Sequence, residues 1–136
     1  MVNKNQWGTY LLAQQKVIDV DRADMLRYEE TLPMLSTPKV TVLVCFEREL
    51  VYLIITFMSS AGMREDELLE LLNQEKNDHL LYPVFRNDED LCLKRTLYND
   101  PNMDCEALMT IIELGLSQLL NGSYNKFNEL KHRVVS

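Results

Sequence analysis

The sequence is poor in the residues that build metal knuckles and disulfide frameworks. Its 136 residues contain three cysteines, Cys45, Cys92 and Cys105, and no CxxC spacing. An odd number of widely separated cysteines argues against a zinc knuckle, a thioredoxin-like motif and a disulfide scaffold. We therefore expect reduced, mostly buried thiols of the kind found in cytoplasmic proteins.

Glycine and proline are also scarce, with four of each in the chain. The glycines are isolated, so the sequence has no P-loop, GxGxxG or GxSxG motif for phosphate binding or nucleophilic catalysis. There is no linker-like tract, internal repeat or low-complexity segment. We interpret residues 1–136 as a single domain.

Long hydrophobic runs and excess positive charge are missing as well. The residues after Met1 lack the apolar stretch of a signal peptide, and the most apolar segment, Leu50–Phe57, is too short for a membrane-spanning helix. The net charge is −7, and an acidic surface repels nucleic-acid phosphates and anionic membranes. We expect a soluble cytoplasmic protein that binds neither nucleic acid nor membranes.

Catalytic constellations are not apparent. The two histidines, His79 and His132, are far apart, and neighbouring Asp78 and His79 would point in different directions on a helix. Cys92 is the one thiol that the pattern marks for a test of reactivity, because its strand face is the less apolar one. With no set of nucleophile, base and orienting group, we expect no enzyme, no catalytic residue, no metal and no cofactor.

The clearest signals that are present belong to two strands, Thr41–Glu47 and Leu50–Phe57, which are rich in β-branched and aromatic residues. Neither segment alternates between apolar and polar residues, so both faces of the sheet are apolar. In the first segment, Val42, Val44 and Phe46 are predicted to point one way, and Leu43 and Cys45 the other. In the second segment, Val51, Leu53, Ile55 and Phe57 are predicted to oppose Tyr52 and Ile54.

The remaining elements are predicted from the periodicity of apolar residues and from proline, glycine and helix-capping residues. We expect helices over 4–18, 64–77 and from the N-cap candidate Asp104 to Asn121-Gly122, a short helix over 123–133, an ambiguous segment 19–31 that favours a strand, and a hairpin of 82–86 with 91–98. Pro33 and Pro38 are expected to bracket a loop. The sequence therefore predicts an α+β fold with helices packed on a mostly antiparallel sheet, in the order α-β-β-β-α-β-β-α.

This order of elements resembles the type III secretion chaperone-like fold, including the YbjN family. The stretches that carry the resemblance are Glu65–Asn73, Leu81–Leu97 and the helix that starts at Asp104. It covers about residues 40–120 and rests on a pattern of elements rather than on a signature motif. The resemblance implies a non-enzymatic protein, often a homodimer, that binds another polypeptide or modulates a regulatory process.

The apolar excess of the two central strands is the feature most relevant to function. Both sheet faces need cover, and the surplus forms either a dimer interface or a groove for an extended peptide, unless helix 4–18 closes the second face. We take Leu43, Tyr52, Ile54 and Leu72 as candidate partner-binding residues. Our leading hypothesis is a protein-binding module that forms a homodimer. The alternative is a small-molecule-binding regulatory domain with a pocket between the sheet and the C-terminal helix.

Negative charge is concentrated in residues 64–90, which carry nine acidic and three basic side chains. Asp88-Glu89-Asp90 lacks the spacing and the glycine of an EF-hand loop, so a calcium site is not indicated. The segment is interpreted as a solvated helix face with a hairpin tip, or as a surface for a basic partner.

Overall fold

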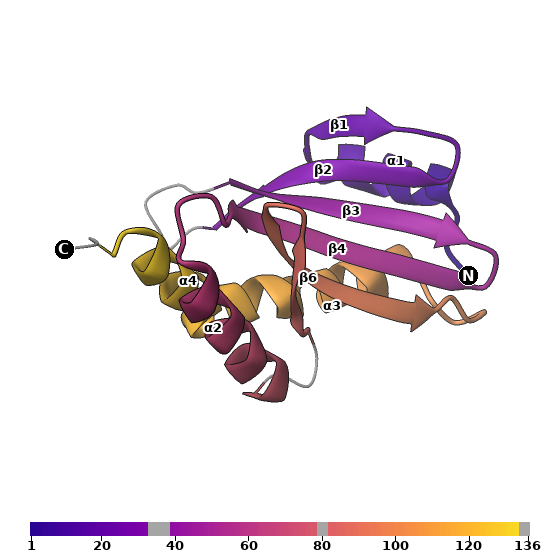
Figure 1. Cartoon of the computed structure of the whole chain (residues 1–136). Coiled ribbons are helices and arrows are strands. Elements are labelled where there is room, and N and C mark those ends of the chain that lie inside the picture. The colour runs from indigo at the N-terminus through magenta and orange to yellow at the C-terminus, as the bar shows by residue number, and fades with distance from the viewer. Residues whose placement is uncertain (33–38, 79–81, 134–136) are drawn as a thin grey trace.

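The computed structural model describes residues 1–32, 39–78 and 82–133, which form helices on an antiparallel sheet (Figure 1). The elements are α1 (Lys4–Ala13), β1 (Ile18–Asp21), β2 (Met25–Thr31), β3 (Lys39–Glu47), β4 (Leu50–Ser59), α2 (Glu65–Asp78), β5 (Val84–Asn87), β6 (Asp90–Tyr98), α3 (Cys105–Gln118), the π-helical turn η1 (Leu119–Ser123) and α4 (Tyr124–Lys131). The six strands form one sheet in the order β1-β2-β3-β4-β6-β5, with every neighbouring pair antiparallel. The predicted α+β class is confirmed.

The N-terminal third contains one more strand than expected. Residues 19–31 form most of a β1–β2 hairpin rather than a single strand, so four strands precede α2. The helix predicted over 4–18 is also shorter, because Gln15 adopts a left-handed φ of 61° and ends it. Ile18 is thereby released to begin β1, where it pairs with Tyr28 of β2.

One face of the sheet is covered by helices. Trp7 of α1 is fully buried, and its indole meets the Tyr28 ring edge-on at a centroid distance of 6.2 Å. The same tyrosine reaches α3, where its Oη lies 3.9 Å from Met109 Sδ. Helices α1 and α3 therefore lie on the same side of the sheet. The alternative in which helix 4–18 closes the second face is wrong.

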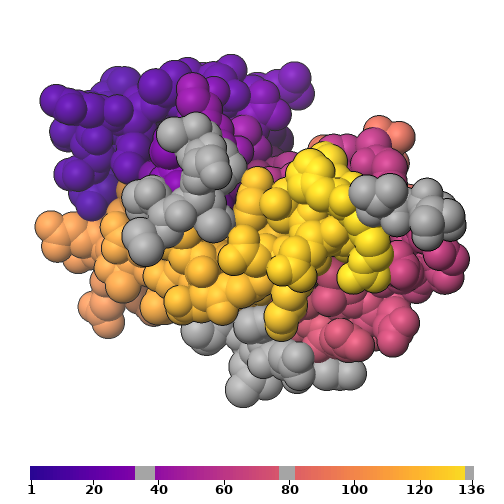
Figure 2. Space-filling model, turned by 90° about the vertical axis from the view of Figure 1, so that its left-hand side faces the viewer, coloured from indigo at the N-terminus to yellow at the C-terminus, as the bar shows by residue number. Residues whose placement is uncertain are grey.

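The C-terminal segment completes this layer at one end of the sheet. The predicted N-cap is confirmed, since the Asp104 carboxylate accepts a hydrogen bond from the Ala107 amide at 2.7 Å. The predicted stop is visible as a kink at Gly122, whose φ of 137° is open to glycine but strained for other residues. The chain then turns into α4, which lies beside α2 (Figure 2) and places Phe127 against Phe57 of β4.

The interior between α3 and the sheet is closely packed. A Cβ atom at Gly115 would lie 2.7 Å from Cδ1 of Ile55 and 3.2 Å from the Tyr82 ring, so glycine permits the approach of the helix. The pocket expected between the sheet and the C-terminal helix has no space at this point.

Across residues 1–32, 39–78 and 82–133, no helix is both long enough and apolar enough to cross a membrane.

Candidate binding surface

The second face of the central strands carries the apolar side chains that the sequence marks as surplus. Along β3 and β4 the burial alternates, and the residues that point away from the helices are only partly buried. No helix in the described part of the chain packs on this face, which lies opposite the helical layer in Figure 1. We call it the open face and define it by Met25, Leu43, Cys45, Leu50, Tyr52, Ile54 and Tyr98.

The strand register arranges these residues in rows across the sheet. One row joins Leu43 and Ile54 in the centre, with Arg27 of β2 and Lys94 of β6 at its two ends. The adjoining row joins Met25, Cys45, Tyr52 and Thr96. Each row thus presents apolar side chains from neighbouring strands to the same surface.

A shallow hollow of about 350 Å³ lies within this face. Its lining includes Leu43, Tyr52 and Ile54, with Glu47 and Lys94 among the charged residues. Farther along the face, Leu50 and Tyr98 pair across β4 and β6 and expose 37% and 57% of their surface, respectively. The hollow therefore belongs to a larger apolar surface rather than to an isolated pocket.

The structure brings together three of the four residues predicted to bind a partner. Leu43 is paired with Ile54, and Tyr52 adjoins both on the same face. Leu72 is elsewhere: it lies on α2, partly buried against the hydrophobic core. Leu69, on the same helix, is 50% exposed.

Four further members of the open face, Met25, Cys45, Leu50 and Tyr98, were not among the residues predicted to bind a partner. Met25 was missed because its segment was ambiguous, and the exposed Leu50 and Tyr98 lie at strand ends. Leu50 and Tyr98 could have been found from the sequence, because each belongs to a strand that was predicted correctly. Leu50 lies two residues before Tyr52 and Tyr98 two residues after Thr96, and residues two apart in a strand share a face.

The charges on the open face differ in whether they are neutralised within the chain. Arg27 is paired with Asp19 at 3.1 Å, and Glu29 with Lys39 at 3.5 Å. Glu47 and Lys94 make no ion pair with any residue that the structure describes, and the Lys94 ammonium lies 5.4 Å from the Phe85 ring centroid.

The thiols are held in their protonated form. Cys92 is 1% exposed, its Sγ lies 3.7 Å from the Phe85 carbonyl oxygen, and burial raises its pKa. Burial, followed by the negative charges of Asp24 and Glu47, also raises the pKa of Cys45 on the open face. Because the thiolate is the reactive form, the environment of Cys92 does not favour the reactivity for which the sequence marked it.

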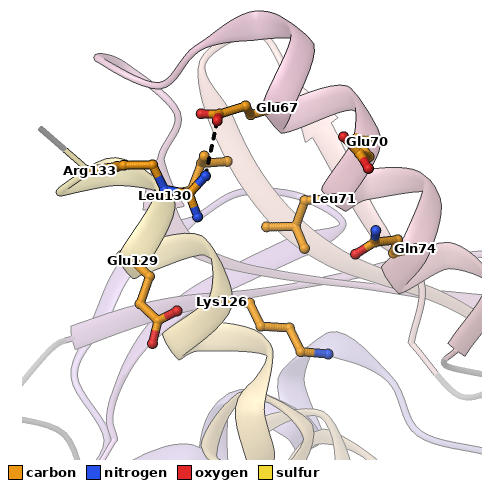
Figure 3. A pocket seen from close by; sticks show the side chains of 8 residues that line it. All are labelled: Glu67, Glu70, Leu71, Gln74, Lys126, Glu129, Leu130 and Arg133. Atoms are coloured by element: carbon orange, nitrogen blue, oxygen red, sulfur yellow. Dashed lines mark hydrogen bonds and ion pairs between the residues drawn. The ribbon is translucent and has the colours of Figure 1, made fainter. Parts of the chain in front are cut away.

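A second hollow, of about 400 Å³, lies between α2 and α4 (Figure 3). Leu71 and Leu130 face it from the two helices, and an ion pair of 3.0 Å joins Glu67 to Arg133 across one end. Beside it, the fully buried Glu75 carboxylate accepts hydrogen bonds from Lys126 and from the Ser123 hydroxyl, each at 2.8 Å.

Several acids of segment 64–90 are therefore neutralised by bases of the same chain. Besides Glu67 and Glu75, Glu65 pairs with Arg86 and Asp66 with Arg64. Within the described residues no group of His, Cys, Asp and Glu side chains is arranged to hold a metal ion. Of the two histidines, His132 is exposed at the end of α4. His79 and the loop from Pro33 to Pro38 lie outside the described residues.

Comparison with protein-family models, curated proteins and solved structures finds no match to this chain.

Proposed function

We propose that this chain is a non-enzymatic protein-binding module, and that the open face is its binding surface. The observation that carries the proposal is a sheet face whose apolar side chains adjoin one another across β2, β3, β4 and β6, with no described helix upon it. Contiguous apolar surface of this kind is typical of interaction sites in soluble proteins.

The composition of the face suits contact with another polypeptide. Tyr52 and Tyr98 offer large, rigid contact area with a polar hydroxyl, and tyrosine is enriched among the residues that dominate binding energy. Each Å² of apolar surface removed from water contributes about 25 cal/mol before the costs of association. Because the hydrophobic core lies on the other side of the sheet, a partner can dock without opening that core.

The resemblance to type III secretion chaperones and YbjN-type regulators supports the same function. Proteins of that fold bind polypeptides, often as homodimers. The order of α1, the sheet, α2 between strands and the long α3 is similar to theirs, although four strands rather than three precede α2. We place the protein in the cytoplasm, where three unpaired thiols remain reduced.

Site-specific photo-crosslinking in cells that produce the full chain tests the proposal. A photoreactive phenylalanine analogue replaces Tyr52 on the open face, and the matched control replaces Leu114, which is 44% exposed on α3. We expect a covalent polypeptide adduct from position 52 and none from position 114, with the adduct identified by mass spectrometry. The additional change Ile54→Lys should remove it, because it places a charge in the apolar surface.

Absence of an adduct at position 52, or equal labelling at both positions, would overturn the proposal. Retention of the position-52 adduct in the Ile54→Lys variant would do the same, since the apolar face would then not be the contact.

A further inference from the structure

Two exposed side chains that line the hollow on the open face, Glu47 and Lys94, carry opposite charges and have no ion-pair partner in the described chain. The third charged residue of the lining, Arg95, is half-buried, and its guanidinium lies 5.7 Å from the Tyr82 ring centroid. Glu47 is the last residue of β3, and Lys94 lies in the middle of β6. Both side chains are exposed. Arg27 and Glu29, which also lie on the open face, already form ion pairs within the chain, with Asp19 and Lys39 respectively.

The register fixes where these two charges lie relative to each other. Glu47 pairs with Leu50 of β4, which pairs with Tyr98 of β6, and Lys94 lies four residues before Tyr98 on the same face. With strands about 4.8 Å apart and a rise of about 3.3 Å per residue, the two Cα atoms are separated by roughly 16 Å. That distance exceeds the screening length at physiological salt, so the two charges do not neutralise each other within one chain.

Tyr52 occupies the middle of this diagonal. It lies on β4, one strand from Glu47 and one strand from Lys94, in the row between them. An apolar surface with opposite charges at opposite corners is complementary to itself. A two-fold axis that passes near Tyr52 in the plane of the interface exchanges the two corners, as an isologous contact requires.

We propose that the partner of the open face is a second copy of this chain, packed face to face so that Glu47 of each copy pairs with Lys94 of the other. The inference rests on the proposed function and specifies its partner. Two equivalent ion pairs then flank an apolar centre of Tyr52, Leu43 and Ile54 from both copies.

The distribution of charge favours a second copy over a basic partner. The four successive rows of the open face that begin at Glu47 and end at Glu29 contain two acidic side chains and two basic ones. The acidic residues are Glu47 and Glu29, and the basic residues are Arg27 and Lys94. The chain as a whole carries a net charge of −7. Most of the excess acid belongs to segment 64–90, on α2 and the β5–β6 turn. Two copies joined through the balanced face need not bring these acidic segments to the interface.

Charge reversal combined with light scattering tests this pairing. The full chain is measured over a range of concentrations as wild type, as Glu47→Lys, as Lys94→Glu, as the double variant and as an equimolar mixture of the two single variants. We expect a wild-type mass of twice 15.9 kDa. Each single variant should dissociate at least about tenfold more readily, because two like-charge contacts replace two ion pairs.

The double variant and the mixture should both recover wild-type association. In the double variant the two charges are exchanged, so the side chains at positions 47 and 94 still attract each other across the interface. In the mixture each heterodimer likewise contains two attractive pairs. The matched controls are Glu113→Lys on α3 and Lys76→Glu on α2, which make the same charge changes at exposed positions away from the open face and should leave the mass unchanged. Circular dichroism confirms that each variant is folded.

A monomeric wild type at every concentration would overturn the inference, as would single variants that behave like the controls or a mixture that stays dissociated. The proposed function fails separately. A monomer whose position-52 probe labels a different polypeptide would refute pairing between copies and leave the binding module intact.

Discussion

The two faces of the central strands have similar side chains and different surroundings. Val44, Leu53 and Ile55 are fully buried on the face that α1, α3 and α4 cover, while Leu43 and Ile54 on the opposite face stay partly exposed. Both faces consist of aliphatic and aromatic residues that favour strands. The position of the helices therefore decides which of the two faces is buried. An apolar strand face indicates that something packs on it, but does not indicate whether that is a helix of the same chain or a partner.

The largest expected effect is a difference in how much the two faces contribute to the free energy of unfolding. Replacing Ile55 by Ala should lower the free energy of unfolding by about 2–5 kcal/mol, because a cavity forms in a fully packed site. Ile54→Ala, on the neighbouring residue of the same strand, should cost under about 1 kcal/mol at protein concentrations where the chain is monomeric. Urea denaturation measures both values. Equal losses of unfolding free energy for the two variants would mean that the open face is buried in the monomer.

A smaller effect concerns the covered side at alkaline pH. Burial raises the pKa of Tyr82 from its ordinary value of 10.0 to about 12, against the opposing influence of the Arg95 charge. The folded state thus retains the phenol proton more tightly than the unfolded chain does. This contribution to stability is present below pH 10 and is lost as the pH rises through about 12.

Urea unfolding at intervals across this alkaline range should therefore show stability falling more steeply in the wild type than in Tyr82→Phe. At neutral pH the variant should lose about 1 kcal/mol, since the hydroxyl donates a hydrogen bond of 2.8 Å to the Ile111 carbonyl. Parallel pH profiles for the two proteins would contradict the assignment.

The smallest effect is a rate of thiol modification and involves no loss of stability. Cys45 lies on the open face and Cys92 is 1% exposed, so a thiol reagent applied to the folded protein should modify Cys45 and spare Cys92. The reaction at Cys45 should be slower than with a free thiol, because its pKa is raised. Mass spectrometry after proteolysis locates the label. Rapid modification of Cys92 in the native state would show that β5 opens.

Much of the fold follows from the sequence because strand and helix periodicity are local. The β3–β4 hairpin, α2, the β5–β6 hairpin and the Asp104 cap all appear within a few residues of their expected positions. Residues 18–31 differ because the end of α1 depends on the backbone of Gln15, a residue type that gives no warning of a left-handed conformation.

The candidate surface is predictable in part for the same reason. Tyr52 and Ile54 share a face by simple alternation, which fixed spacing within a strand ensures. Leu43 joins them only through the register of β3 with β4. Leu72 was grouped with them on apolar character alone, and only the tertiary fold shows that α2 lies away from the open face. The positions of Glu47 and Lys94 on either side of Tyr52 likewise depend on the register between strands, which the order of residues along the chain does not contain.

The position of β6 in the sheet has a consequence for the newly made chain. β4 pairs with β6 in the interior of the sheet, yet α2 and β5 lie between them in the sequence. During synthesis one edge of β4 therefore stays without its hydrogen-bonding neighbour until residue 98 has left the ribosome. A strand that is apolar on both sides and open at one edge is prone to aggregate. Slower translation between β4 and β6 should thus lower the yield of folded protein.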